Sequence, residues 1–269
     1  MKPTASWLPW SLTTAAILVQ IAWPLTAGDT RTATTEVIVV LFAAASISHA
    51  AVFRGARWAV EFVGVSIAFG FLVELLGTST GFPFSAYSYT DQLSPQVLGV
   101  PLIIPLAWTM MSYPALLVGR RLARGRVVRI LVGGFALASW DLFLDPQMVG
   151  EDYWRWAQPE PALPGVPGIP IVNYLGWLLA AGVLMAALSV LPDVAAPEGV
   201  PATLFLWTWV GGIVANAVFL GRGWVAVWGG IGMGLVAVPY AVSLYRAWRR
   251  GVVADASPHV RRDLPVVGP

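Results

Sequence analysis

The sequence contains no cysteine and has few charged residues. Because cysteine is absent from all 269 residues, a disulfide framework, a thiolate nucleophile and cysteine-ligated zinc or iron–sulfur sites are excluded. The two histidines are too few for a histidine-rich di-iron site. Charged residues make up 11% of the chain and hydrophobic residues 57%, whereas about a quarter of a soluble domain is charged. We therefore expect lipid, not water, to be the main solvent.

Apolar stretches long enough to cross a membrane recur along almost the whole chain. A helix needs about 20 mostly apolar residues to span the hydrocarbon core. The stretches are continuously apolar, whereas the strands of a membrane barrel alternate in polarity. The sequence thus predicts an all-α, polytopic transmembrane bundle of about eight helices, near residues 10–27, 35–53, 59–78, 99–118, 127–145, 171–191, 201–220 and 224–246.

We expect one transmembrane domain over residues 1–246, with the core motifs in 59–191, and a disordered cytoplasmic tail over 247–269. The first apolar segment also has some features of a secretory signal peptide, which is an alternative to a first membrane helix.

Lysine and arginine are distributed unevenly between the two ends of the predicted helices. If both termini are cytoplasmic, three of the 16 basic residues, Arg31, Arg155 and Arg222, fall outside and the other 13 inside, as the positive-inside rule requires. We therefore expect a multi-pass protein of the cell membrane with both termini cytoplasmic. Basic residues at helix ends meet anionic lipid, so the net charge of +2 does not indicate nucleic-acid binding. The longest loops, 79–98 and 146–170, then lie outside, and their Pro, Gly, Tyr and Trp content favours packed, interfacial structure.

The exits of these two loops have similar sequences. VLGVPLIIPLAW (Val97 to Trp108) and VPGIPIVNYLGW (Val166 to Trp177) align without a gap at an offset of 69 residues. This similarity predicts that the third and fourth helices, and the fifth and sixth, are two copies of one hairpin. Chance similarity between two apolar stretches is the alternative. If the repeat is real, the copies should face each other, and a site between them would use residues of both.

Four acidic residues fall well inside predicted spans: Glu61, Glu74, Asp141 and Asp145. An acid at a helix centre costs about 2.5–3.5 kcal/mol on insertion scales, and such residues usually mark function. Asp141 and Asp145 are spaced i, i+4 and so share one helix face. Low dielectric, nearby like charges and the negative end of a helix dipole all disfavour an ionised carboxyl, so we expect at least one of these acids to carry a proton. A protonated carboxyl beside an apolar cavity suits acid catalysis on a lipid.

Two of the acids have competing structural interpretations. Glu61 lies one turn from Arg57, and we favour an ion pair between them. Asp145 precedes Pro146, which biases it out of the helix and into a water-exposed turn. For the other two acids we favour a functional role, because their depth in the span is hard to explain otherwise.

Common nucleotide, nicotinamide, serine-hydrolase and zinc-protease motifs do not occur in the sequence. Asp141 and Asp145 match half of a magnesium–diphosphate motif of membrane prenyltransferases, but the second aspartate cluster is absent. We therefore predict no metal ion and no cofactor.

Four motifs in the middle of the chain resemble those of membrane-bound carotenoid hydratases of the carotenoid 1,2-hydratase type, which includes the γ-carotene and bisanhydrobacterioruberin hydratases. They occur in the family's order and cover about 100 residues: VELLGTSTGFPFSAYSYTD (Val73 to Asp91), GVPLIIPLAWTMM (Gly99 to Met111), SWDLFLDPQMV (Ser139 to Val149) and G-x-P-x-x-N-Y-x-G-W (Gly168 to Trp177). The tract from Ala157 to Gly168 is richer in proline than the family pattern and departs from it.

The resemblance implies carotenoid biosynthesis, with cofactor-independent addition of water to the terminal C1=C2 bond of an acyclic (ψ) end group. The expected partners are the lipophilic carotenoid, the bilayer and other enzymes of the carotenoid pathway. As site residues we predict three catalytic acids, with Glu61 as a secondary candidate, and five substrate-binding residues: Glu74, Asp141 and Asp145, then Tyr87, Tyr89, Trp108, Asn173 and Trp177. The alternatives are a carotenoid end-group cyclase or isomerase, and a proton-coupled transporter that uses the same acids as a relay.

Overall fold

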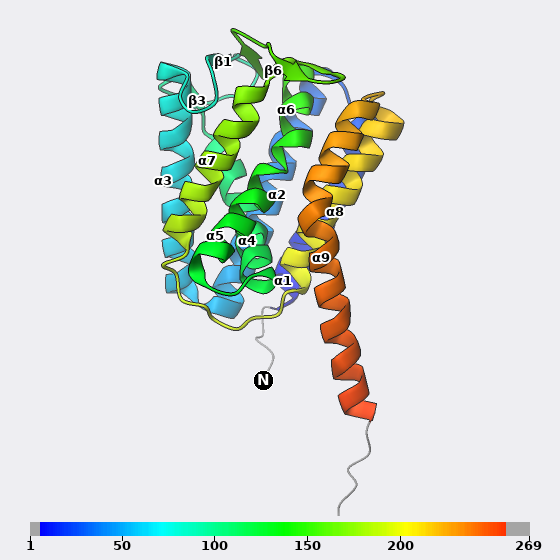
Figure 1. Cartoon of the computed structure of the whole chain (residues 1–269). Helices are drawn as coiled ribbons and strands as arrows, with labels where there is room; N and C mark the ends of the chain where they lie inside the picture. Colours follow the sequence, from blue (N-terminus) through cyan, green and yellow to red (C-terminus); the bar gives the residue numbers. More distant parts are fainter. Residues whose placement is uncertain (1–5, 257–269) are drawn as a thin grey trace, which may run out of the picture.

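The chain is built mainly of α-helices, and the computed structural model describes residues 6–256, with side chains through residue 250 (Figure 1). The helices, in chain order, are α1 (Trp7–Ala22), a 3-10 turn η1 (Trp23–Leu25), α2 (Gly28–Arg54), α3 (Ala56–Thr80), α4 (Ile103–Leu122), α5 (Arg126–Ala138), α6 (Asp141–Gly150), α7 (Ile171–Leu188), α8 (Gly199–Val214), a π-helical turn η2 (Ala215–Phe219) and α9 (Gly223–Ala256). The predicted helical membrane bundle is confirmed.

Seven helical segments of the described chain are long and apolar enough to cross a membrane: α1 with η1, α2, α3, α5 with α6, α7, α8 with η2, and α9. The remaining helix, α4, lies in the middle of the bundle and contacts α2, α3, α5, α7, α8 and α9 (Figure 1). Its side chains from 107 to 119 are all buried. Polar side chains are tolerated there because they find partners on neighbouring helices, as Thr109 does with Ser66 at 2.9 Å.

Short strands close one end of the bundle, called here the loop end. The first loop contains β1 (Tyr87–Tyr89), β2 (Gln96–Val97) and β3 (Val100–Pro101), and the second contains β4 (Trp154–Trp156), β5 (Ala162–Leu163) and β6 (Val166–Pro170). The pairs β2–β3 and β5–β6 are antiparallel hairpins within one loop. Strand β1 pairs antiparallel with β4 and so joins the two loops. Loop composition predicts packed structure but not these strands.

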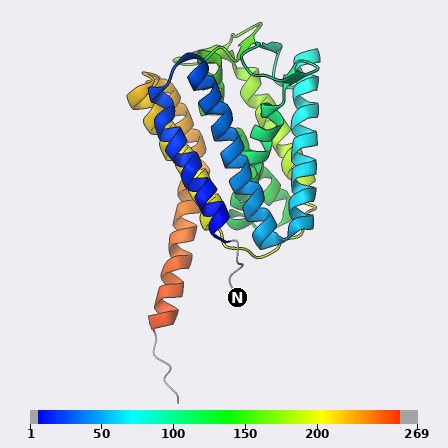
Figure 2. The same ribbon diagram turned by 180° about the vertical axis from the view of Figure 1, so that it is seen from behind.

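Both loops lie at the same end of the bundle, and the N-terminal start of α1 and the last turns of α9 lie at the other (Figures 1 and 2). The three basic residues predicted to be outside lie at the loop end: Arg31 pairs with Glu151 at 2.9 Å, Arg155 is in β4, and Arg222 donates to the Pro146 carbonyl at 3.0 Å. The end that carries the loops is therefore also the end that is poor in arginine.

Several predicted boundaries differ from the structure, and among them the second span is predicted from residue 35 but begins at Gly28. The fourth span is predicted from residue 99, but residues 100–101 form β3 and the helix begins at Ile103. The fifth span, predicted as one helix over 127–145, is two helices, because a tight turn at Ser139 and Trp140 separates α5 from α6. Helix α9 continues to Ala256, past residue 246, and the rest of the predicted tail, 257–269, lies outside the described residues.

Candidate active site

Glu74, near the end of α3, is buried and accepts hydrogen bonds from three side chains. Its Oε1 accepts the indole N–H of Trp108 at 2.8 Å, and its Oε2 accepts the hydroxyls of Tyr87 and of Tyr89, the latter at 2.7 Å. Trp108 comes from α4 and the two tyrosines from β1, so three segments of the chain, α3, β1 and α4, converge on one carboxyl group. A buried carboxyl group held in this way satisfies its oxygens without any cationic partner.

Asp145 of α6 is buried in a matching cage. Its Oδ1 accepts the indole N–H groups of Trp154 and Trp156 at 2.7 and 3.2 Å, and its Oδ2 accepts the amide of Asn173 at 2.6 Å. The same amide nitrogen also donates to Oδ2 of Asp141 at 2.7 Å. An indole or amide N–H can only donate, so every neighbour bonded to Asp145 favours an oxygen that accepts.

The pairing of β1 with β4 places these donors. Side chains two residues apart in a strand point to the same face. Tyr87 and Tyr89 therefore point inward together, and so do their cross-strand partners Trp156 and Trp154. The rings of Tyr87 and Trp156 are 5.0 Å apart, and those of Tyr89 and Trp154 are 5.7 Å apart. An aromatic layer thus connects the Glu74 and Asp145 cages.

Burial raises the pKa of the Tyr87 and Tyr89 hydroxyls well above their usual range, and the adjacent Glu74 carboxyl raises it further. Both hydroxyls therefore keep their protons at any physiological pH. Each can still act as donor or acceptor, because a phenol carries both functions. The Glu74 cage is therefore more adaptable to a change of protonation than the Asp145 cage.

A second aromatic cluster lies beside the carboxyl groups. The rings of Trp108 and Trp177, which align with each other in the two similar loop-exit sequences, stack with centroids 4.3 Å apart and planes 7° apart. Trp140 meets Trp177 edge to face, with an interplanar angle of 86°. All three tryptophans line the cavity, and the π face of an aromatic ring attracts a cation.

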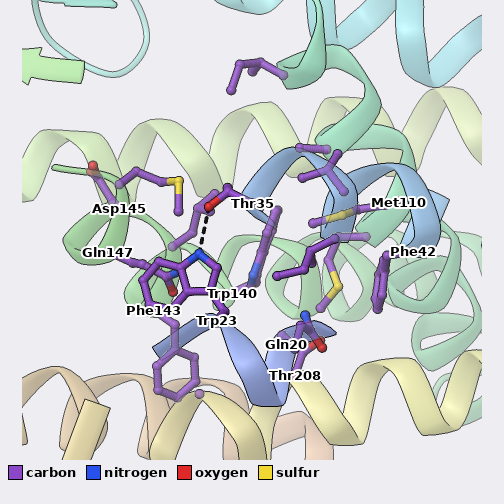
Figure 3. Close-up of a pocket in the computed structure, with 18 of the residues that line it drawn as sticks. Gln20, Trp23, Thr35, Phe42, Met110, Trp140, Phe143, Asp145, Gln147 and Thr208 are labelled. Atoms are coloured by element: carbon purple, nitrogen blue, oxygen red, sulfur yellow. Dashed lines mark hydrogen bonds between the residues drawn. The ribbon is translucent and has the colours of Figure 1, made fainter. Parts of the chain in front are cut away.

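Glu74 and Asp145 line one cavity of about 390 Å³. Its wall is mainly apolar and aromatic, and it extends from the two cages to α1 and α8 (Figure 3). All five predicted substrate-binding residues line it as well: Tyr87, Tyr89, Trp108, Asn173 and Trp177. A largely apolar pocket with a few convergent polar groups is the usual form of a site for a small apolar ligand.

Two of the predicted acids do not line this cavity. Asp141 is fully buried, lies behind Asn173, and its Oδ1 has no hydrogen-bond partner among the described residues. Glu61 lies elsewhere on α3 and forms the ion pair expected from its spacing, 2.8 Å from Arg57. The geometry thus brings Glu74 and Asp145 together at the cavity, whereas Asp141 is connected to the cavity only through its hydrogen bond with Asn173.

Two expectations about the aspartates are wrong. Asp145 is not in a water-exposed turn, because α6 continues through Pro146 to Gly150 and only 1% of Asp145 is exposed. The residue before a proline is biased away from helix, but burial of this segment outweighs that bias. Asp141 is the first residue of α6, so it faces the positive end of a helix dipole and not the negative end.

Sequence reasoning misses Trp154, Trp156 and Trp140. A signal for the first two is present: Trp-x-Trp follows Asp145 much as Tyr-x-Tyr follows Glu74. Such an alternation of aromatic residues indicates a short strand with one buried face.

These features define a membrane-embedded site in which two carboxyl groups face an apolar, aromatic cavity. A family model described as "Carotenoid biosynthesis protein" matches residues 34–242, and the chain belongs to this family. The chain is also 34% identical over 117 residues to the bisanhydrobacterioruberin hydratase of Haloarcula japonica. That match covers 41% of this chain and 38% of the relative, well under half of the relative's length. No solved structure matches the chain.

Proposed function

We propose that the protein adds water to the terminal C1=C2 double bond of an acyclic carotenoid end group and produces a tertiary 1-hydroxy group. Membership of the carotenoid biosynthesis family and the hydratase name of the partial relative support this reaction class. The observation that carries the proposal is the pair of carboxyl groups, Glu74 and Asp145, at one apolar cavity with different hydrogen-bond cages.

Hydration of a trisubstituted alkene needs one acid and one base. Protonation of the less substituted carbon, C2, leaves a tertiary cation at C1, and water then bonds to C1 and loses a proton. We assign the first proton to Glu74, because the two tyrosine hydroxyls beside Oε2 can accept from a protonated carboxyl as readily as they donate to an ionised one. The proton moves from Oε2 to C2, and the π electrons form the new C–H bond.

Asp145 is the matching base. The three groups bonded to it, two indole N–H groups and the Asn173 amide NH₂, all donate, which favours the ionised carboxylate that can accept a proton from the attacking water. Asp141 acts as a positioning residue, since it shares the Asn173 amide with Asp145 and does not reach the cavity. Return of one proton from Asp145 to Glu74 completes the cycle, so no redox step is needed.

The aromatic wall has two roles in this reaction. The faces of Trp177 and Trp140 stabilise the cation at C1, and a cation over an aromatic face gains about 2 kcal/mol when it is desolvated. The same apolar wall restricts water to the carboxyl end of the cavity, so that the cation is captured there and not elsewhere along the polyene.

The orientation of the protein in the membrane is part of the proposal. The loop end carries few basic residues, which supports a position outside the cytoplasm, and both termini would then be cytoplasmic. The reacting end group would meet water at the outer interface, close to the loops.

Expression in a host that accumulates acyclic carotenoids, followed by mass analysis of the extracted pigments, tests the function. Glu74→Gln and Asp145→Asn should each reduce hydration about 10²- to 10⁴-fold, the usual share of general acid–base catalysis. Glu61→Gln is the matched control, because it removes an acid from the same helix as Glu74 but lies away from the cavity.

The product decides between the candidate reactions. Hydration adds the mass of one water molecule to the pigment, whereas cyclisation or isomerisation leaves the mass unchanged. If the host that expresses the wild-type protein keeps its pigments unchanged, and the protein moves a polar solute across vesicle membranes, a transporter would be favoured. Full activity in Glu74→Gln would remove this residue from the mechanism.

A further inference from the structure

The cavity is too small for a whole carotenoid. Its volume of about 390 Å³ suits one drug-sized ligand. A C40 polyene is much longer than such a ligand, so only its end group and the adjoining part of the chain can lie inside. The rest of the polyene must leave the cavity through a gap in the helix wall and lie in the lipid.

The exposed part of the cavity wall lies on one side only. Among the described residues that line the cavity, the four that are strongly exposed come from α1 and from α8 with η2: Ile21 (54%), Val210 (46%), Val214 (44%) and Phe219 (57%). The other lining side chains are buried or partly buried. All four exposed residues are apolar, as expected for a surface that faces hydrocarbon. The cavity wall is thus continuous with the lipid-facing surface at this place.

The contacts between α1 and α8 show where this gap ends. Both helices start at the end opposite the loops, and α1 runs alongside α8 (Figure 2). Near their first turns they touch: a Cβ on Gly199 would lie 2.8 Å from the Trp10 ring. Further along, the Trp207 indole donates to Oε1 of Gln20 at 2.7 Å. The exposed lining residues all lie beyond this hydrogen bond, towards the loop end.

We propose that this lateral opening, formed by Ile21, Val210, Val214 and Phe219, is where the polyene chain of the substrate passes between the cavity and the bilayer. The inference rests on the proposed function for the identity of the occupant. Figure 3 shows Gln20 and Thr208 on one side of the cavity and Asp145 on the other, so a chain that enters beside α8 points its end group towards the carboxyl groups. The Gln20–Trp207 hydrogen bond forms the floor of the opening.

Because the opening contacts the polyene chain and not the end group, a substitution in the opening should affect long substrates and leave short substrates with the same end group unaffected. Val214→Trp would fill the opening from a position that is already half exposed, so the protein should still fold. Val218→Trp is the matched control, because Val218 lies one turn further on, is 70% exposed and does not line the cavity. Both variants are compared with the wild type in lipid vesicles, with an acyclic C40 carotenoid and with a short acyclic terpene that ends in the same isopropylidene group.

The expected result is a loss of about tenfold in kcat/KM for Val214→Trp on the carotenoid, mainly through KM, with the short terpene converted at the wild-type rate. Val218→Trp should convert both substrates normally. Equal carotenoid activity in the two variants would overturn the opening, and so would an equal loss on both substrates in Val214→Trp. The amount of carotenoid that co-purifies with the protein separates this inference from the proposed function. If the wild type retains carotenoid without hydrating it, only the proposed reaction is refuted. The opening is then tested by comparing the carotenoid retained by Val214→Trp, which should fall, with that retained by Val218→Trp, which should not.

Discussion

Replacing Asp145 or Glu74 by its amide removes one carboxyl group in each case, but the two changes should differ in their effect on folding. The Asp145 cage consists of two indole N–H groups on Oδ1 and the Asn173 amide on Oδ2. In Asp145→Asn the new NH₂ group faces a donor in either orientation. Turning Asn173 to accept would set its oxygen against Oδ2 of Asp141, which is repulsive while that carboxyl is ionised. The variant therefore retains at least one unsatisfied or repulsive buried contact.

The cost of that contact can be estimated. A buried donor without a partner costs about 1–3 kcal/mol in proteins generally, and polar contacts inside membranes average about 0.6 kcal/mol with a maximum near 1.7. We expect Asp145→Asn to lose about 1–2 kcal/mol of unfolding free energy. In Glu74→Gln the amide nitrogen can face the hydroxyls of Tyr87 and Tyr89, which then accept, while the oxygen keeps the Trp108 bond. Its cost should be smaller than that of Asp145→Asn, because one tyrosine hydroxyl can turn its proton towards the oxygen of the other.

The assay combines two measurements on the same purified proteins in detergent. Denaturant titration gives the unfolding free energy, and product analysis gives the hydration rate. Both variants should lose activity by at least about 10²-fold, and Asp145→Asn should lose more stability than Glu74→Gln. Equal unfolding free energies in the two variants would refute the assignment of one donor-only cage and one adaptable cage.

Three other perturbations test the fold and the orientation. Gly176→Ala places a Cβ 2.5 Å from the Pro83 carbonyl oxygen, so overpacking should cost about 1–3 kcal/mol in the same titration. Ser88→Pro removes a backbone N–H from the middle of β1, at a residue whose side chain is exposed. Activity should therefore fall, and stability should drop by about 1 kcal/mol. Ser88→Ala, which keeps the N–H, should behave like the wild type. In the cysteine-free chain, Asp91→Cys should react with an impermeant thiol reagent added outside the cells and Arg124→Cys should not; the reverse pattern would invert the orientation.

Hydrophobic run length predicts most of the fold. It locates the helices because each lipid-exposed segment must be apolar over its full length. It fails at Trp140, where α5 ends and α6 begins, since both sides of that break are buried and equally apolar. It also fails at Ile103, because the apolar residues before it belong to a hairpin and not to the helix.

The depth of the acids in their spans predicts part of the site. Glu74 and Asp145 are found in this way, because an acid in an apolar span needs an explanation. The distinction between Asp145 and Asp141 is not accessible from the i, i+4 spacing, which puts both on one face. It depends on the position of Asn173 on α7, because Asn173 lines the cavity and bonds to both aspartates, whereas Asp141 does not line it. Trp154 and Trp156 are missed because the pairing partner of their strand lies in another loop.

The pairing of β1 with β4 explains why the site needs both loops. Each loop alone has a short strand with one inward-facing aromatic pair, and an isolated strand of three residues has no ladder to hold it. When the strands pair, the tyrosines of the first loop and the tryptophans of the second are fixed in a single layer, and each pair donates to the carboxyl group of the helix that precedes its loop. Neither buried carboxyl group has its full set of donors until the other loop is in place, so the two cages form together. A change confined to one loop should therefore disturb both carboxyl groups, although it touches only one of them.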